Sequence, residues 1–588
     1  MRIRTLLALG AALVATAPAF ADTVVLVDQS ATARPSRQLN DSDRTAYRQI
    51  AAALRAKDWA TAASALDALP SGALTPVFRA ELYAARGAPK ADIATLTALL
   101  AAAPELPECP ALARLAAAQG ATALPPLAVQ HDLVRVAGAS KRAMVRPTRS
   151  DTVALKLATQ VQPLFKANDP ATAEPLIEMA AAQLTPEAQS EWRARLAWAY
   201  FQMGDDASAR RVADIAKEGA GDWAAQAAWV SGLAAWRQAD YAAAEGAFDR
   251  VASRGIDSET IAAGYFWAAR SATAGGKPNE VSYRLRSAAR YGETFYGLLA
   301  TAALGTAPAT PAFNPALAAS EGLLQHANIR AAAALVEIGE SDLADQLIRQ
   351  QARIGSALEH DALIAFAGRM GLPATQLWLA QNAPAGAQTS PMARYPMPAW
   401  APSGGWRVDK ALLYAHALQE SQFRSDAVSR TGARGLMQLM PGTAKLVARH
   451  RGDPMTMADR MTDPALNFEY GQSYLEELAN NAGTGGLLPK VIAAYNAGPN
   501  NVALWNLKTN VQQDPLLFIE AIPFAETRAY VAIVMRNYWM YQRQVGATPT
   551  SMIAMAQGQW PRFPELAGAT ASRGAVASGV SNEVAAPN

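Results

Sequence analysis

Between about residues 41 and 380, apolar side chains recur at the three- and four-residue spacing of an amphipathic helix, and no stretch shows the sustained alternation of a strand. The apolar runs are short and rich in alanine. They break at glycine, proline and aspartate, as in "QMGDD", "RQADY", "AGGKPNE" and "EIGESD". The pattern predicts one short helix after another and an all-α fold for this region.

The breaks repeat along the chain. When "LAWAYFQMGDDASARRVADI" is laid over "SGLAAWRQADYAAAEGAFDRV", Asp205 falls on Asp240 and Ala209 on Ala244, a period of about 35 residues. This period is typical of helix-turn-helix repeats of the tetratricopeptide kind, which stack into a superhelix. Two interpretations are open: an extended concave scaffold that binds something, or a plain helical domain.

Composition changes mark the domain boundaries. Residues 381–405 are rich in proline, glycine and alanine and predict a linker. Residues 406–547 form a second, mainly helical block. After that block the periodicity fades, and residues 548–588 predict a disordered tail. The superhelical domain is therefore expected to span residues 22–380.

The first 21 residues have the pattern of a cleaved secretory signal. A basic "MRIR" precedes an apolar run, and the small-residue sequence "AFA" ends directly before Asp22. An N-terminal anchor helix is the alternative interpretation. The only cysteine, Cys109, excludes an internal disulfide, and a soluble periplasmic protein is expected.

Charge and hydropathy exclude two classes of partner. The formal net charge is +3 over 588 residues, and no run of lysine and arginine could follow a phosphate backbone, so nucleic acid is not expected. No later apolar run is long enough to span a bilayer, so membrane insertion is not expected either.

The first candidate for chemistry is Glu420 in "ALQESQF". Asp409 can cap a helix on which Leu413, Ala417 and Glu420 share one face, so the carboxyl continues an apolar stripe at the C-terminal end. Burial and the negative end of the helix dipole both favour the protonated form, which a general acid requires. The alternative is an ordinary solvated glutamate.

Three further motifs follow Glu420. In "GARGLMQLMPGTA", glycines frame a loop whose Gln438 can hydrogen-bond an amide or hydroxyl. "VIAAYNAGPNNV" ends a helix, and "IPFAETRAYV" begins another, where Glu526 and Arg528 could form a structural ion pair. Each motif alone also fits a packed loop or a helix end.

Together and in this order, "ES", "GLMQLMP", "AYNAGP" and "IPFAETRAYV" resemble the soluble lytic transglycosylases, over about 140 residues. The resemblance implies a lysozyme-like catalytic domain on a ring-shaped α-superhelix. It also implies cleavage of the bond between N-acetylmuramic acid and N-acetylglucosamine in peptidoglycan, leaving a 1,6-anhydro end. Peptidoglycan glycan strands are then the expected partner, with other cell-wall proteins as candidate partners of a monomeric superhelix.

The resemblance also assigns roles to residues. Glu420 would protonate the glycosidic oxygen and then act as a base, without a metal or cofactor. The substrate-binding residues would be Ser421, Met437, Gln438, Tyr495, Asn496 and Glu526.

Two alternatives to this function remain open at this point. One is a hydrolytic muramidase of related fold, in which Asp426 or another carboxylate activates water. The other is a non-catalytic scaffold that binds peptidoglycan.

Overall fold

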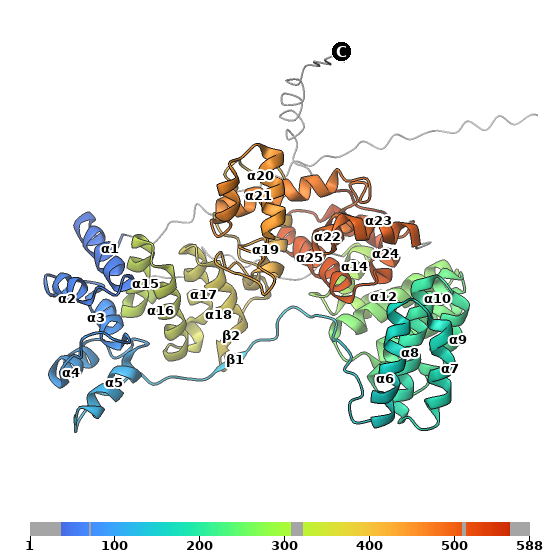
Figure 1. Cartoon of the computed structure of the whole chain (residues 1–588), viewed down its shortest axis with the longest axis horizontal. Coiled ribbons are helices and arrows are strands. Elements are labelled where there is room, and N and C mark those ends of the chain that lie inside the picture. Colours follow the sequence, from blue (N-terminus) through green and yellow to red (C-terminus); the bar gives the residue numbers. More distant parts are fainter. Residues whose placement is uncertain (1–36, 70–71, 307–321, 509–512, 565–588) are drawn as a thin grey trace, which may run out of the picture.

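The computed structural model describes residues 37–69, 72–306, 322–508 and 513–564, and most residues of this part of the chain are helical. Within these ranges there are 26 α-helices and a single sheet of two short strands (Figure 1). The all-α prediction is confirmed. The predicted signal peptide, residues 1–21, lies outside the described residues. No helix in the described ranges is both long and apolar enough to cross a membrane.

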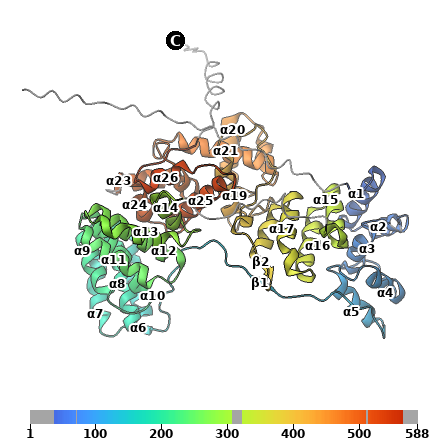
Figure 2. The ribbon, with the colours of Figure 1, turned by 180° about the vertical axis from the view of Figure 1, so that it is seen from behind.

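The first five helices form one end of the scaffold, where they lie beside α15 (Figures 1 and 2). The amides of Gln38 and Leu39 donate to the Glu337 carboxylate at 2.6 and 3.3 Å, and Arg55 pairs with Glu340. The start of the chain is thus fastened to a segment about 300 residues later. These helices are α1 (Asp41–Arg55), α2 (Trp59–Asp67), α3 (Thr75–Ala84), α4 (Ile93–Ala102) and α5 (Cys109–Ala118).

An extended strap without helix, residues 121–150, connects α5 to the next group of helices. Its centre, β1 (Leu133–Arg135), pairs antiparallel with β2 (Asn382–Pro384). The prediction of helix after helix from 41 to 380 is wrong here. Pro125 and Pro126 supply no amide hydrogen and disfavour helical geometry in the residue before each of them. Within the strap, β1 takes its backbone partners from β2, and Ala128 and His131 donate to the carbonyl oxygens of Pro104 and Arg353.

A second group of helices stacks in pairs after the strap. Its members are α6 (Thr152–Lys166), α7 (Pro170–Ala181), α8 (Pro186–Met203), α9 (Asp206–Ala216), α10 (Asp222–Arg237), α11 (Tyr241–Arg254), α12 (Ser258–Ala274), α13 (Val281–Ala289) and α14 (Phe295–Ala303).

A two-residue turn motif connects paired helices. One residue takes a left-handed conformation, and the aspartate after it caps the next helix by accepting an amide hydrogen three residues on. The aligned Asp205 and Asp240 both act in this way, as the repeat predicts. The four such pairs are Lys57–Asp58, Asn168–Asp169, Gly204–Asp205 and Ala239–Asp240.

Close contact between helices explains one glycine of the repeat. A Cβ on Gly232 of α10 would lie 2.6 Å from the ring of Phe248 on α11. That ring is fully buried, with Trp229 5.3 Å away in an edge-on arrangement and Trp267 at 5.4 Å. The aromatic cluster therefore fills the space that a side chain at position 232 would need.

The chain then returns through α15 (Ala327–Ile338), α16 (Ser341–Ile354), α17 (His360–Arg369) and α18 (Pro373–Gln381). The predicted linker, residues 381–405, is packed rather than loose. It contains β2 and the 3₁₀ turn η5 (Pro391–Arg394), buries Met392 and Tyr395, and places Arg394 in an ion pair with Glu293.

The C-terminal domain sits above the middle of the scaffold in Figure 1. Its helices are α19 (Lys410–Glu420), α20 (Pro441–Arg451), α21 (Pro464–Ala479), α22 (Leu488–Ala497), α23 (Pro499–Lys508), α24 (Pro515–Ala521), α25 (Ala525–Gln544) and α26 (Thr550–Ala556).

The prediction of a disordered tail is wrong for residues 548–564. Ser551 on α26 accepts a hydrogen bond from the indole of Trp539 at 2.9 Å. The Trp560 ring lies 5.5 Å from that of Phe518, and Arg562 pairs with Leu487 through the backbone. A hydrogen bond, a ring contact and a backbone bridge hold this segment, and its one helix of 7 residues is too short to show a clear period in the sequence. Residues 565–588 lie outside the described part of the chain.

One buried carboxylate joins the scaffold, the strap and the C-terminal domain. Glu520 of α24 is 2 % exposed, accepts two hydrogen bonds from Arg142 of the strap at 2.8 and 3.2 Å, and accepts one from Tyr296 of α14 at 2.7 Å. Nearby, Phe295 stacks on Trp539 at 5.1 Å. The domain is therefore fixed on the scaffold by buried contacts, which are costly to break.

The packing of the repeat makes a stability prediction. Gly232→Ala should lower the free energy of unfolding by about 1–3 kcal/mol, because the added methyl meets a buried ring that cannot move aside. Gly246→Ala is the matched control: no atom lies within 4 Å of its added Cβ, and α11 should gain about 0.5–1 kcal/mol from reduced unfolded-state freedom. Urea denaturation of both variants measures the two effects, and equal stabilities would contradict the packing described.

Candidate active site

Helix α19 carries Glu420 as its last residue. Asp409 caps the helix by accepting from the Ala411 amide at 2.9 Å, and residues 411–417 are buried, so the helix is firmly embedded. Immediately after Glu420 the backbone reverses through two left-handed residues, Gln422 (φ 54°) and Phe423 (φ 62°). Phe423 is held by burial against Tyr414. Consecutive strained residues of this kind are common beside functional groups.

The environment of Glu420 favours its protonated form. Burial raises the pKa of this carboxyl to about 7, a hydrogen bond from Tyr530 opposes the rise, and the negative charge of Glu526 adds to it. The Tyr530 hydroxyl donates to Glu420 Oε1 at 2.6 Å. A carboxyl with this pKa is about half protonated at neutral pH, which suits a group that must both give and take a proton.

A buried histidine fixes the direction of that hydrogen bond. His416, one helical turn before Glu420, is fully buried, and burial lowers its pKa to about 3, so it is neutral at working pH. Its Nδ1 lies 2.8 Å from the Tyr530 hydroxyl oxygen. Since Tyr530 gives its only hydrogen to Glu420, Nδ1 must carry a hydrogen and donate to Tyr530. Oε1 is then an acceptor, and Oε2 is the oxygen that carries a transferable proton.

The loop after Glu420 is built on one obligatory glycine. Gly435 has φ +75°, and a Cβ there would lie 2.0 Å from the carbonyl oxygen of Met461. Gln438 is also left-handed (φ 47°), and its side-chain amide donates to the carbonyl oxygens of Ala427 and Gly435 at 3.0 and 2.8 Å. The Gln438 nitrogen thus serves the loop itself, while its carbonyl oxygen is left for other contacts.

Met437 was expected among the substrate-binding residues, and its side chain is fully buried and packs against Gly471. The backbone of Met437 makes two hydrogen bonds that hold the loop. The Met437 amide donates to Asn467 Oδ1 at 2.7 Å, and its carbonyl accepts from the Tyr495 hydroxyl at 2.7 Å. Met437 therefore joins the loop to α21 and α22.

The structure brings Tyr495 to the carboxyl. Its ring lies 4.7 Å from that of His416, and the Glu420 charge helps burial to raise the Tyr495 pKa well above its usual range. Asn496, next to it, accepts a hydrogen bond from Thr527 at 2.6 Å and keeps its amide nitrogen free of any partner in the described residues.

Ser421 is buried, and its hydroxyl donates to the Ala417 carbonyl at 3.1 Å, so it closes the end of α19. Glu526 is exposed in the first turn of α25, where its charge still reaches Glu420. The ion pair considered between Glu526 and Arg528 does not form. Arg528 Nη1 donates instead to the Ile522 carbonyl at 2.7 Å.

Sequence reasoning missed three residues of the site. His416 falls on the buried face of α19, where a histidine in the sequence is easily interpreted as an ordinary core residue. Tyr530 lies inside the motif "IPFAETRAYV", but nothing in the spacing shows that it reaches a carboxyl 110 positions earlier. Asn467 is buried within α21 and satisfies both the Met437 amide and the Met461 carbonyl. For Asn467, the available signal in the sequence was an amide side chain on an otherwise apolar helix face.

Comparison with known proteins agrees with this site and fold. Residues 399–518 match the family described as Transglycosylase SLT domain. The soluble lytic murein transglycosylases of Escherichia coli K12 and Salmonella typhimurium are 35% and 33% identical over 158 and 159 residues. Each alignment covers 27% of this chain and 24% of the relative, so the match spans about a quarter of the length of these curated relatives.

Solved structures extend the likeness in fold to most of the chain. The 70 kDa soluble lytic transglycosylase of Escherichia coli aligns with 18% identity and a TM-score of 0.52, over 89% of this chain and 99% of that one. An inactive glutamate-to-glutamine mutant of the lytic transglycosylase Slt from Pseudomonas aeruginosa aligns with 19% identity and a TM-score of 0.51, over 89% and 90%. The fold is therefore that of a lysozyme-like domain on a helical superhelix.

The sequence matches lie in the part of the chain that holds Glu420, and the structural matches cover the scaffold as well. The resemblance expected from the four motifs is confirmed. Residues 399–518 are thus a Transglycosylase SLT domain, and this part of the chain is similar to the soluble lytic murein transglycosylases.

The hydrogen bond from Tyr530 leads to a prediction about proton affinity. Tyr530→Phe removes the donor that stabilises the Glu420 carboxylate, so the pKa of Glu420 should rise further above about 7. Titration of the carboxyl by carbon-detected NMR measures the shift. Tyr474→Phe is the control, since its ring contacts Tyr495 and no hydrogen bond joins it to Glu420. An unchanged or lowered pKa in Tyr530→Phe would contradict the described direction of the bond.

Proposed function

We propose that the protein is a periplasmic lytic transglycosylase that cleaves the β-1,4 bond between N-acetylmuramic acid and N-acetylglucosamine of peptidoglycan. The observation that carries the proposal is the single carboxyl, Glu420, held near neutrality at the end of α19 inside an SLT domain. The relatives are named as murein transglycosylases, which supports the same substrate.

In the proposed reaction Glu420 acts twice. Its Oε2 proton passes to the glycosidic oxygen as the bond to the anomeric carbon breaks, and the hydrogen bond from Tyr530 stabilises the carboxylate that remains. The carboxylate then takes the proton of the C6 hydroxyl of the same muramic acid. The freed oxygen attacks the anomeric carbon and closes a 1,6-anhydro ring. No water is consumed, and Glu420 ends protonated as it began.

A hydrolytic muramidase would need a base for water, usually a second carboxylate across the scissile bond. The two other acids considered do not favour that role, because Asp426 and Glu526 are both exposed. Tyr495, whose pKa the Glu420 charge raises, and the neighbouring Asn496 fit contact with the reacting sugar. One neighbour of similar fold is a 70 kDa soluble lytic transglycosylase in complex with bulgecin A, and we propose the Glu420 cleft as the corresponding site here.

The products distinguish the proposed reaction from hydrolysis. Digestion of purified sacculi should release muropeptides lighter by the mass of one water than hydrolytic products, without a reducing end. Mass spectrometry before and after borohydride reduction checks both properties. Chiefly reducing, full-mass products would show that the protein is a hydrolytic muramidase. Undigested sacculi would favour the non-catalytic scaffold.

The role of Glu420 makes the second functional prediction. Glu420→Gln keeps the shape of the side chain and removes the transferable proton, so turnover of sacculi should fall by roughly two to four orders of magnitude with little change in Tm. In the unaltered protein, kcat/KM should fall as pH rises through about 7, because the acid form of Glu420 is consumed there.

Two matched controls accompany this variant. Asp426→Asn should cost little activity. Glu526→Gln removes the charge that raises the Glu420 pKa, so it should move the alkaline limb of the pH profile to lower pH and leave most of the maximal turnover. If Glu420→Gln stayed active on sacculi, the mechanism would be wrong.

A further inference from the structure

The short sheet of the strap has one covered edge and one open edge. β2 (Asn382–Pro384) lies against α16 and α18, and in Figure 1 it lies between α18 and β1. The Asn382 amide already donates to the Leu379 carbonyl at the end of α18, and Pro384 has no amide hydrogen. The edge that can accept a further strand is therefore that of β1 (Leu133–Arg135).

The register shows which backbone groups face this open edge. The Val136 amide donates to the Gln381 carbonyl at 2.9 Å, so Val136, and Val134 two residues before it, turn their backbone toward β2. Leu133 and Arg135 alternate with them and point their N–H and C=O groups away from β2. Within the described ranges, no residue hydrogen-bonds these outward groups. β1 thus presents unpaired donors and acceptors along this edge.

The side chains of β1 bear on whether another strand is admitted or repelled. Val134 is 54 % exposed, and Arg135 is exposed without an ion pair in the described part of the chain. An exposed charge on a strand edge either keeps other strands away or selects a strand of opposite charge. The charge of the surrounding strap favours the second role for Arg135.

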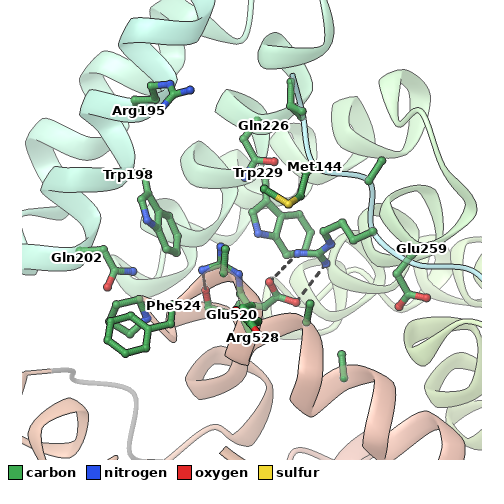
Figure 3. A pocket seen from close by; sticks show the side chains of 18 of the residues that line it. Met144, Arg195, Trp198, Gln202, Gln226, Trp229, Glu259, Glu520, Phe524 and Arg528 are labelled. Atoms are coloured by element: carbon green, nitrogen blue, oxygen red, sulfur yellow. Dashed lines mark hydrogen bonds and ion pairs between the residues drawn. The ribbon is translucent and has the colours of Figure 1, made fainter. Parts of the chain in front are cut away.

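The strap, residues 121–150, carries a concentrated positive charge. It holds five basic residues and one acidic residue, an excess larger than the net charge of +3 of the whole chain. Arg142 is neutralised by Glu520, whose hydrogen bonds appear in Figure 3. The other basic side chains are exposed and form no ion pair with a described residue; they are Arg135, Lys141, Arg146 and Arg149. An extended, exposed segment with this charge favours an acidic partner.

The alternation of side chains along β1 sets the sequence pattern that fits. Leu133 and Arg135 face one side of the sheet, and Val134 faces the other. A strand paired along this edge places one residue opposite Arg135 and its neighbour beside Val134. Cross-strand pairs are favourable between opposite charges and between apolar side chains. The matching segment therefore alternates acidic and apolar residues.

We propose that the outer edge of β1 binds an extended acidic segment of a partner protein, which adds a third strand to the sheet. Backbone hydrogen bonds to Leu133 and Arg135 hold the segment, while the Arg135 charge and the Val134 side chain select its sequence. This binding is independent of the proposed function, since Glu420 and its surroundings take no part in it. It gives the strap a second role, as a docking strand, beside that of connecting the two groups of scaffold helices.

Binding of synthetic peptides to the full-length protein tests the proposal. The probe is a fluorescent peptide of about ten alternating glutamate and valine residues, and its anisotropy is measured. One control peptide replaces each glutamate with lysine. A second replaces each valine with proline, which keeps the charge and prevents strand pairing. The glutamate–valine peptide should bind about 10-fold or more tightly than either control.

Substitutions at position 135 separate the charge from the backbone. Arg135→Gln removes the charge alone and should weaken binding of the glutamate–valine peptide about 2- to 5-fold. Arg135→Pro also removes the outward amide, without loss of a hydrogen bond between β1 and β2, and should weaken binding about 10-fold or more. Arg86→Gln changes an exposed arginine in the loop after α3 and should leave the affinity unchanged.

Hydrogen exchange in the unaltered protein gives a readout that requires no substitution. Saturating glutamate–valine peptide should slow exchange of the Leu133 and Arg135 amides about 10-fold or more, because both enter new hydrogen bonds. The Val134 and Val136 amides, which already face β2, should change little.

Equal affinity for the glutamate–valine and glutamate–proline peptides would show that the strap is only a basic surface, and would overturn strand addition. Unchanged exchange at Leu133 and Arg135 in the presence of saturating peptide would overturn it as well. If Arg135→Gln bound the peptide as tightly as the unaltered protein, Arg135 would not be the residue that selects an acidic segment.

Discussion

The C-terminal domain depends on one constraint: the Glu420 carboxyl must be dry enough to keep a proton at neutral pH and open enough to release it. Helix α19 meets the first requirement by embedding in the core, and the left-handed reversal at Gln422 and Phe423 meets the second by ending the helix at the carboxyl. Burial alone would raise the pKa of Glu420 further. The Tyr530 hydroxyl opposes this rise, and its direction is set by the neutral ring of His416. The pKa of Glu420 is thus set by α25, which carries Tyr530 and Glu526, as well as by α19.

The scaffold and the domain share a second buried carboxylate with the opposite role. Glu520 accepts hydrogen bonds from Arg142 and Tyr296 on two other segments, and it joins parts of the chain that are distant in sequence. Such a junction ties the position of α24 and α25 to the scaffold. Since α25 carries Tyr530, the geometry around Glu420 and the seating of the domain on the superhelix are mechanically connected.

Much of this could be predicted from the sequence. Helical periodicity gave the fold class, the aligned Asp205 and Asp240 marked true helix caps, and the apolar stripe on α19 led to Glu420. The failures have physical causes. The strap at residues 121–150 takes its hydrogen bonds from a strand 250 residues later, and residues 548–564 are held by scattered aromatic contacts. Neither leaves a local period. The burial of the Met437 side chain could not be foreseen, because a loop motif shows which residues are present and does not show which side of the backbone they occupy.

The remaining site residues were hidden for a related reason. His416 and Asn467 are polar groups inside apolar helix faces, and their partners come from other elements, so only three-dimensional proximity reveals their use. Pairwise contacts over more than a hundred positions, such as that between Tyr530 and Glu420, carry no signal in a single sequence.

The two-residue turn of the scaffold has an implication for evolutionary drift. Each turn requires one residue in a left-handed backbone conformation and one aspartate that caps the next helix. Lysine, asparagine, glycine and alanine all occur at the first position. The helices between the turns combine small residues with buried aromatic rings where they cross, as at Gly232 and Phe248. A framework with so few fixed positions can exchange most of its side chains while keeping its curvature. The catalytic domain, whose loop at Gly435 admits no Cβ, has far less freedom to diverge.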